Sequence, residues 1–355
     1  MKNKLEFIVL LFLMLYNAQT KKILVKNTDD DFNGTLTEQH ILQLGYTYDS
    51  ESIFLRAQNI TFIAPYTFKN FTNLRTLSIT INPIEVIEST AFKGMTILQS
   101  LILDANALQQ IENASFFDLK NLTALSLSFN LIENLSFGTF LGLDKLENLS
   151  IANNQLYDID SNLFSNLKLL KNLDMHWNEF GEFKSTEIFK NNQQLEFLDL
   201  SDTRLTIVNE DLFSNLNELK YLYLSLNLLS SIDSNLFSQL GKLKNISLAW
   251  NQITNINSSE IFRNNKDIEY IDLSNNQLTI MDKNLFRNLS SINVVNIKFN
   301  NFTNVDFDII QGCYEVKLLC LYSNAMNKNV TLNLEGLENI EVKLIMDKNC
   351  DYKDL

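Results

Sequence analysis

The sequence predicts an α/β repeat solenoid, in which short parallel β-strands from successive turns of the chain stack into one sheet. Three observations predict this fold. Apolar residues return in the same order about every 24 residues, one asparagine recurs within each copy, and one phenylalanine recurs near its end. A regular period of this length is the signature of repeat architectures. A single copy cannot bury its own apolar side, so its stability depends on its neighbours.

The stretch LKYLYLSLNLLSSIDSNLFSQLGK, residues 219–242, shows one full copy of the repeat. Positions within a copy are numbered from zero at the first leucine, which places Leu219 at position zero and Asn227 at position eight. Two copies are one residue longer than the rest. A degraded first copy begins near Ser50, and the others begin at Leu74, Leu98, Leu122, Leu146, Leu170, Leu195, Leu219, Leu243, Ile268, Ile292 and Val316.

The leucines at positions three and five are expected to lie in a short strand and point inward, while the residue between them points outward. The asparagine at position eight lies where the chain turns inward, and its amide can bond to buried backbone groups of the neighbouring copy. Thr203 replaces this asparagine once, and Gln58 occupies the position in the first copy. The asparagines are Asn82, Asn106, Asn130, Asn154, Asn178, Asn227, Asn251, Asn276, Asn300 and Asn324.

The recurring phenylalanine is expected to fill the wider outer side of each turn, so that the copies build a second apolar column. These residues are Phe68, Phe92, Phe116, Phe140, Phe164, Phe189, Phe213, Phe237, Phe262 and Phe286.

This pattern resembles the leucine-rich repeat family, in its 24-residue extracellular form, over roughly residues 50–349. The resemblance implies a curved horseshoe with the parallel sheet on its concave side and irregular or short helical segments on its convex side. We expect about 12 repeats within residues 50–340.

Both ends of the solenoid need caps that shield the apolar edge of a terminal repeat. Residues 21–49 contain no cysteine and are expected to form a cysteine-free N-terminal cap. Residues 341–355 are expected to hold a last strand, with Leu344 in it, and a reduced C-terminal cap. The segment Asn349–Cys350–Asp351 is similar to the start of the C-terminal cap in secreted insect leucine-rich immune proteins, such as those of mosquitoes.

Residues 1–20 are typical of a secretory signal peptide. Lys2 and Lys4 precede an apolar run from Phe7 to Leu15, and small or polar residues follow at a candidate cleavage site. The run is too short to span a bilayer. The sequence therefore predicts a secreted, extracellular protein without a membrane span.

Secretion would make the Asn-x-Ser/Thr motifs available for glycosylation. Nearly all of these asparagines avoid the inward positions of the repeat. They are Asn33, Asn59, Asn70, Asn113, Asn121, Asn134, Asn148, Asn245, Asn257, Asn288, Asn301 and Asn329.

Charge and motifs argue against several classes of function. The net charge of −13 disfavours binding to a phosphate backbone, which needs a basic surface. The sequence contains no nucleotide-binding glycine loop, nucleophile elbow or zinc-protease motif, and only two histidines, His40 and His176. We therefore predict no enzymatic activity and no cofactor.

One constellation resembles a metal site. Asp174 and His176 lie two residues apart on one predicted strand, beside Asp199 of the next strand. Carboxylate and imidazole groups in this arrangement could hold a metal ion. A solvated polar face is the more common explanation of such residues, so no metal is predicted.

Positions two, four, six and seven are expected to face the concave hollow. In the central repeats these positions carry aromatic and charged residues, the composition of a protein-binding patch. The alternative is that aromatic residues simply pack well on neighbouring strands. Asn148 and Asn245 also lie at position two, so glycans could cover part of the hollow. The predicted partner-binding residues are Trp177, Phe197, Tyr221, Tyr223, Trp250, Tyr270, Asp174, His176, Asp199, Asp202 and Asp272.

The chain has three cysteines, an odd number. Cys313 occupies a position where other copies place a leucine, which predicts a buried thiol. Cys320 lies between Leu319 and Leu321 and is expected to face the concave side. Cys350 could form an intermolecular disulfide and so a disulfide-linked dimer.

These features, with the resemblance, predict a secreted, non-enzymatic protein-binding protein that acts in innate immunity by binding extracellular, complement-like partners. The alternative is an adhesion or developmental signalling module, shed from or related to cell-surface repeat proteins. A metal-dependent or glycosidase-like enzyme would need Asp174, His176 and Asp199 to lie in a pocket. A Toll-type receptor ectodomain would need a membrane span.

Overall fold

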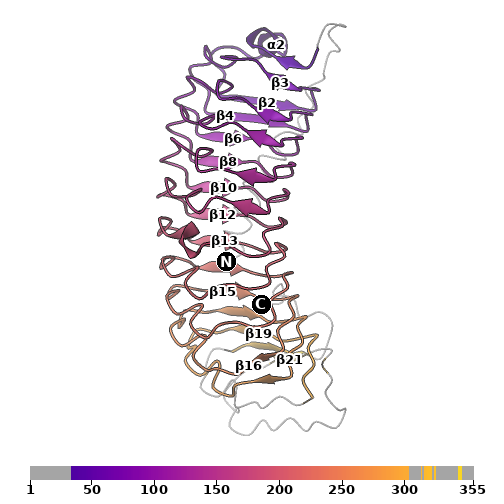
Figure 1. Ribbon diagram of the computed structural model, residues 1–355, viewed down its shortest axis with the longest axis vertical. Coiled ribbons are helices and arrows are strands. Elements are labelled where there is room, and N and C mark those ends of the chain that lie inside the picture. The colour runs from indigo at the N-terminus through magenta and orange to yellow at the C-terminus, as the bar shows by residue number, and fades with distance from the viewer. Residues whose placement is uncertain (1–32, 304–312, 314–315, 322–323, 325–342, 346–355) are drawn as a thin grey trace.

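The structure is a computed structural model that describes residues 33–303, 313, 316–321, 324 and 343–345. These residues form one curved solenoid whose strands lie side by side along its length (Figure 1). The long sheet has 13 parallel strands, as the repeat pattern predicts. In order they are β2 (Ser52–Arg56), β4 (Thr76–Thr80), β6 (Ser100–Ile102), β8 (Ala124–Ser126), β10 (Asn148–Ser150), β12 (Asn172–Asp174), β13 (Phe197–Asp199), β14 (Tyr221–Tyr223), β15 (Asn245–Ser247), β17 (Tyr270–Asp272), β19 (Val294–Asn296), β20 (Leu318–Cys320) and β21 (Lys343–Ile345).

Neighbouring strands pair with equivalent repeat positions opposite each other. Leu198 of β13 lies opposite Leu173 of β12 and Leu222 of β14, and all three side chains are buried. Because side chains alternate between the two faces of a strand, the residues on either side of these leucines point to the concave face. Each concave position therefore forms a row that runs across the sheet.

The asparagine ladder is present as predicted. The Asn227 amide donates to the carbonyl oxygens of Leu200 at 2.8 Å and Leu224 at 3.1 Å, and its Oδ1 accepts the Leu205 N–H at 2.9 Å. Asn227 is only 3% exposed. Where Thr203 replaces asparagine, its hydroxyl donates to the Leu200 carbonyl at 2.7 Å, and its N–H donates to Asn227 Oδ1 at 3.1 Å. The same amide pattern recurs at Asn130, Asn154, Asn178, Asn251, Asn276 and Asn300.

The phenylalanine column is also confirmed. The rings of Phe164 and Phe189 stack with centroids 6.0 Å apart, and those of Phe237 and Phe262 with centroids 5.7 Å apart. All ten phenylalanines of the column are buried. The inward leucines and this column form one continuous hydrophobic core along the solenoid.

Two buried asparagines in the longer repeats were not anticipated from the sequence. Asn192 and Asn265 each follow the column phenylalanine by three residues, where shorter repeats place a leucine. The Asn192 amide donates to the carbonyls of Phe164 at 3.0 Å and Leu167 at 2.9 Å of the preceding repeat. Asn265 makes the equivalent bonds at 2.9 and 2.8 Å. A repeat with one extra residue thus uses an amide to bond carbonyls of its neighbour.

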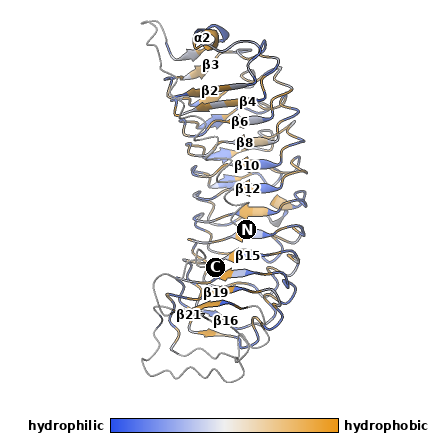
Figure 2. Ribbon diagram, turned by 180° about the vertical axis from the view of Figure 1, so that it is seen from behind, coloured by the Kyte–Doolittle hydropathy of each residue, from blue (hydrophilic) through white to orange (hydrophobic). Residues whose placement is uncertain are grey.

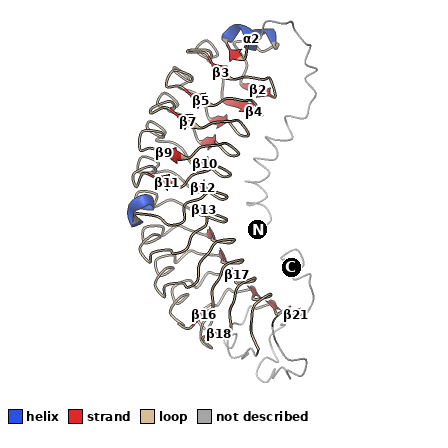
Figure 3. Cartoon of the chain, turned by 45° about the vertical axis from the view of Figure 1, so that its right-hand side comes forward, coloured by secondary structure: helices blue, strands red, loops and turns tan. Residues whose placement is uncertain are grey.

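The convex side is irregular and carries short strand pairs opposite the long sheet (Figure 3). Helix is scarce among the described residues, being limited to α2 (Glu38–Gln43) and the 3₁₀ helix η1 (Thr186–Phe189). The convex pairs are β5 (Val86–Ile87) with β7 (Gln110–Ile111), β9 (Asn134–Leu135) with β11 (Asp158–Ile159), and β16 (Asn255–Ile256) with β18 (Ile280–Met281).

At the N-terminal end, residues 33–49 close the first repeat. Strand β1 (Thr35–Leu36) pairs with β3 (Phe62–Ile63), and Ile41 of α2 is buried in the core. The Tyr46 hydroxyl donates to the Phe54 carbonyl at 2.9 Å and accepts the Phe54 N–H at 3.0 Å. Since β2 is the edge strand of the long sheet, this phenol bonds backbone groups that no neighbouring strand reaches.

At the C-terminal end, β21 occupies the predicted last strand. Cys313 is a buried free thiol that donates to the Phe286 carbonyl at 3.1 Å, as predicted from its leucine-like position. Cys320 is buried beside Val294 and Leu318 in a small cluster of concave positions.

Several predictions concern parts of the chain outside the described residues. These are the signal peptide at residues 1–20, the start of the N-terminal cap, Asn329, Cys350 and the end of the C-terminal cap. Within the part of the chain that the structure describes, no helix has the length and apolar character needed to cross a bilayer.

Candidate functional site on the concave face

Five of the predicted site residues lie on the concave face of β12, β13 and β14. Register places Asp174 opposite Asp199, and Asp199 opposite Tyr223. In the row formed by position two, Phe197 lies opposite Tyr221. The Phe197 and Tyr223 rings are in contact, with centroids 5.6 Å apart. An acidic pair therefore borders an aromatic group on one continuous surface, which we call the central patch: Asp174, Asp199, Phe197, Tyr221 and Tyr223.

Hydropathy differs along the sheet around this patch. Figure 2 shows hydrophilic residues in β10 and β12, whereas β2 and β4 near the N-terminal end are hydrophobic. The polar character arises from asparagine, serine and aspartate at the outward positions of β10 and β12.

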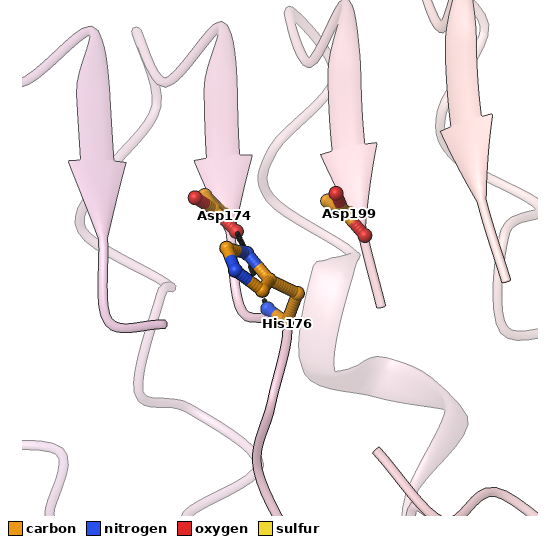
Figure 4. Close-up of side chains that lie close together, drawn as sticks. All are labelled: Asp174, His176 and Asp199. Carbon is orange, nitrogen blue, oxygen red and sulfur yellow. Dashed lines mark hydrogen bonds and ion pairs between the residues drawn. The ribbon is translucent and has the colours of Figure 1, made fainter. Parts of the chain in front are cut away.

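Asp174, His176 and Asp199 lie close together, as predicted (Figure 4). His176 Nδ1 lies 2.6 Å from Asp174 Oδ1. Asp174 Oδ2 accepts the Ser150 hydroxyl at 3.2 Å, and Asp199 Oδ1 accepts the Ser201 N–H at 2.8 Å. One ligand atom from each of the three side chains lies within 4.8 Å of the others, so the group is close enough to hold a metal ion. Its half-buried, hydrogen-bonded side chains also fit the solvated polar face that we expected.

The protonation equilibria of this group are perturbed. Burial, followed by the charge of Asp174, raises the pKa of Asp199. Burial by itself would lower the pKa of His176, but the hydrogen bond that its ring N–H donates to Asp174 and the charges of Asp174, Asp199 and Asp202 outweigh burial and raise that pKa. The neighbouring carboxylates thus stabilise protonated and positively charged groups on this part of the face.

The two tryptophans lie at the turn that follows the strands. Trp177 is 50% exposed and Trp250 is 59% exposed. Both adopt φ of 56°, in the left-handed region that only a few per cent of non-glycine residues occupy. The Trp177 N–H donates to the Ser201 carbonyl of the next repeat at 3.0 Å, which helps to hold this turn.

Sequence reasoning picked out only part of this row. Position seven has a left-handed backbone in every described repeat from Ala57 to Phe299. Four further large apolar side chains are exposed at this position: Ile81, Phe129, Leu226 and Phe299. Reading position seven in all copies, rather than in the central ones, would have found them.

The sequence did not predict a hydrogen-bond network between Asp104 and the serines of the concave face. Asp104 Oδ1 accepts the Ser126 hydroxyl at 2.5 Å and the Ser128 N–H at 2.9 Å. The Ser128 and Ser150 hydroxyls lie 2.6 Å apart, and Ser150 donates to Asp174. Burial raises the pKa of Asp104 to about 6. The network connects this half-buried carboxyl to the central patch through Ser128 and Ser150, which lie at positions six and four.

The remaining predicted residues differ in accessibility. Tyr221, Tyr223, Asp202 and Asp272 are half-buried, whereas Phe197 is only 8% exposed and packs beside Tyr223. The Tyr270 hydroxyl donates to Asp272 Oδ2 at 2.9 Å, and burial with the Asp272 charge raises the pKa of Tyr270.

The glycosylation motifs in the described residues all lie at sites with some solvent access. Most are exposed, and Asn121, Asn148 and Asn245 are half-buried. Asn148 Oδ1 accepts the Asn172 amide at 2.7 Å on the concave face.

The repeats match a known family. A family model described as "Leucine rich repeat" matches residues 51–106, 72–132, 120–180 and 193–253, and a second model of the same description matches residues 267–289. The chain belongs to the leucine-rich repeat family. No curated protein matches it over its sequence.

Solved leucine-rich repeat structures share the fold at low identity. The leucine-rich repeat domain of APL1B is 21% identical, with a TM-score of 0.66, over 87% of this chain and 86% of that one. Toll, in the Drosophila Toll–Spatzle complex, is 18% identical, with a TM-score of 0.67, over 88% of this chain and 45% of that one. TLR13, in a complex with ssRNA13, is 24% identical, with a TM-score of 0.64, over 81% of this chain and 47% of that one. This leucine-rich repeat chain thus spans less than half the length of the Toll and TLR13 chains.

Proposed function

We propose that this protein is a secreted, non-enzymatic binding protein of innate immunity that holds an extracellular protein partner against its concave face. The observation that carries this proposal is the set of large aromatic residues on and beside the central patch. Trp177 and Trp250 are exposed, and Tyr221 and Tyr223 are half-buried on the same sheet. Aromatic side chains of this size supply most of the energy at protein interfaces, and a sheet holds them in place before binding.

One structural neighbour supports a protein partner. Toll is seen in a complex with Spatzle. TLR13 is seen with RNA. For this chain the net charge of −13 and the concave carboxylates disfavour a polyanion, because phosphate contacts require basic residues. A complement-like protein is the class of partner that we propose.

Extracellular location is supported by the predicted signal sequence at residues 1–20 and by the solvent access of the described Asn-x-Ser/Thr motifs. The alternative proposal is an adhesion or developmental signalling module. It is favoured by the Toll–Spatzle complex, which is described as a hub in Drosophila development and innate immunity.

The test is to recover partners from native extracellular fluid, identify them by mass spectrometry and measure their affinity. Trp177→Ala and Tyr223→Ala should each weaken binding by about 1–3 kcal/mol without unfolding the protein, because each truncates an interface anchor. Tyr157→Ala is the matched control, since Tyr157 is 55% exposed next to the convex strand β11. Equal affinity of wild type, Trp177→Ala and Tyr223→Ala would refute the concave-face proposal. Recovery of cell-surface signalling proteins instead of complement-like ones would favour the alternative.

A further inference from the structure

The middle of the concave face is acidic and lacks basic residues. In the repeats that begin at Leu98 through Ile268, positions two, four, six and seven carry no lysine or arginine. They carry five carboxylates instead: Asp104, Asp174, Asp199, Asp202 and Asp272. His176 is the only histidine at these positions. Arg56 and Lys298 occupy position six only in repeats towards the two ends.

Position one, just before each strand of the long sheet, carries charges of both signs. At position one, lysines and glutamates of neighbouring repeats form ion pairs, with Lys171–Glu147 and Lys220–Glu196 at 2.8 Å and Lys244–Glu269 at 2.9 Å. Among the ion pairs of the described residues, none joins a concave carboxylate to a lysine or arginine, and Asp174 pairs with His176. The lysines and glutamates at position one therefore neutralise each other. The concave carboxylates keep a net negative charge that a positively charged group of another molecule could bind.

The central patch concentrates this charge at one point. Asp174 and Asp199 occupy directly opposite positions of β12 and β13. Like charges in this relation destabilise a sheet. A cation placed against both carboxylates would relieve this repulsion.

The neighbouring aromatic residues specify the shape of that cation. Tyr223 lies directly opposite Asp199, and its ring contacts Phe197. A guanidinium group is planar, bonds carboxylates through two parallel N–H groups and stacks on aromatic rings, whereas an ammonium group is a compact, strongly hydrated charge. We propose that the central patch binds an arginine side chain of the protein partner, with the guanidinium on Asp174 and Asp199 and against Tyr223. This inference rests on the proposed concave-face function.

The direct test uses the purified protein and three short peptides that differ at one residue. One peptide carries arginine, one carries lysine, and one carries citrulline, the uncharged isostere of arginine. Isothermal titration calorimetry should show the arginine peptide binding about tenfold more tightly than the citrulline peptide, the scale of a charge-assisted bidentate pair. Raising the salt from about 50 mM to about 500 mM should reduce this difference, because the Debye length shortens. The lysine peptide should bind more weakly than the arginine peptide.

Two variants remove the carboxylates. Asp174→Asn and Asp199→Ser should each abolish most of the preference for arginine over citrulline. Serine is used at residue 199 because asparagine there would create the glycosylation motif Asn-Leu-Ser with Leu200 and Ser201. Asp211→Asn is the control, because it removes the same charge from an exposed residue of the same repeat as Asp199, outside the strand positions. This control should keep wild-type preference.

The other outcomes are also decisive. Equal binding of the arginine and citrulline peptides, or of the arginine and lysine peptides, would overturn the assignment. So would binding of Zn²⁺ alone to Asp174, His176 and Asp199 with no binding of the arginine peptide. If Trp177→Ala loses the native partner while Asp174→Asn and Asp199→Ser keep it, the proposed function stands and the arginine inference falls. If all of these variants keep the partner, both fall.

Discussion

At the scale of single residues, the asparagine at position eight illustrates why the repeat requires particular chemistry. Its amide can donate and accept at once, so one side chain bonds carbonyls of two repeats and an N–H group. Thr203 shows the limit of substitution. Its hydroxyl reaches the Leu200 carbonyl, and Asn227 from the next repeat bonds the Thr203 N–H.

Asn227→Ala should lower the free energy of unfolding by about 3 kcal/mol or more, because it leaves several buried backbone groups without partners. Chemical denaturation measures this change. Asn217→Ala is the control, since Asn217 is exposed and its replacement should stay within about 0.5 kcal/mol of wild type. A similar effect of both substitutions would contradict the assigned role of the ladder.

Asp104 should make stability depend on pH. Its folded-state pKa of about 6 lies above the ordinary value of 3.8, so the folded state binds this proton more tightly than the unfolded state. The contribution of this protonation to the free energy of unfolding is fully present below about pH 4 and is lost as the pH rises through about 6. The difference in the free energy of unfolding between Asp104→Asn and wild type should therefore favour the variant more at pH 8 than at pH 4. Denaturation across this pH range measures the difference. Identical profiles for wild type and Asp104→Asn would disprove the assignment.

At the scale of the element, each strand of the long sheet is only three to five residues long, and its stability depends on the side chains packed behind it. The position-three and position-five residues supply the inner core, and the phenylalanine column supplies the outer core. The outward residues are free to vary because they do not contribute to this packing. This separation allows β12 to carry Asp174 and β14 to carry Tyr223 on the same scaffold.

Leu224→Ala should cost about 2–5 kcal/mol of stability, because Leu224 is fully buried and truncation leaves a cavity. Thermal or chemical denaturation tests this prediction. Trp177→Ala provides the comparison, since its side chain is half exposed and its loss should affect partner binding far more than stability. A larger loss of stability in Trp177→Ala than in Leu224→Ala would contradict the assignment of position five to the core and position seven to the surface.

At the scale of the whole molecule, the solenoid is a one-dimensional stack in which each repeat contacts its neighbours. Stability in such a stack is approximately a sum of repeat and interface contributions. The stack gives a long concave face whose rows run across many strands, so residues far apart in the sequence form one surface. Asp104 and Asp174 are 70 positions apart, yet Ser128 and Ser150 connect them by hydrogen bonds.

Much of this arrangement could be predicted because contacts in a stack follow the period. The proximity of Asp174 and Asp199 follows from their shared position four in adjacent repeats, and His176 follows Asp174 by two residues on the same side of the chain. The burial of Phe197, the left-handed row at position seven and the serine network could not be predicted in the same way. They depend on side-chain size and on hydrogen bonds between several successive repeats, which the period alone does not describe.

The sequence by itself determined the family, the register and the inward columns, because one pattern of apolar residues and asparagine repeats with every turn and each turn packs on the next. The tertiary structure decided which outward side chains touch, which carboxyl groups are buried and how their pKa values shift. These properties depend on distances of a few ångströms and on local desolvation, which arise only when the turns are stacked.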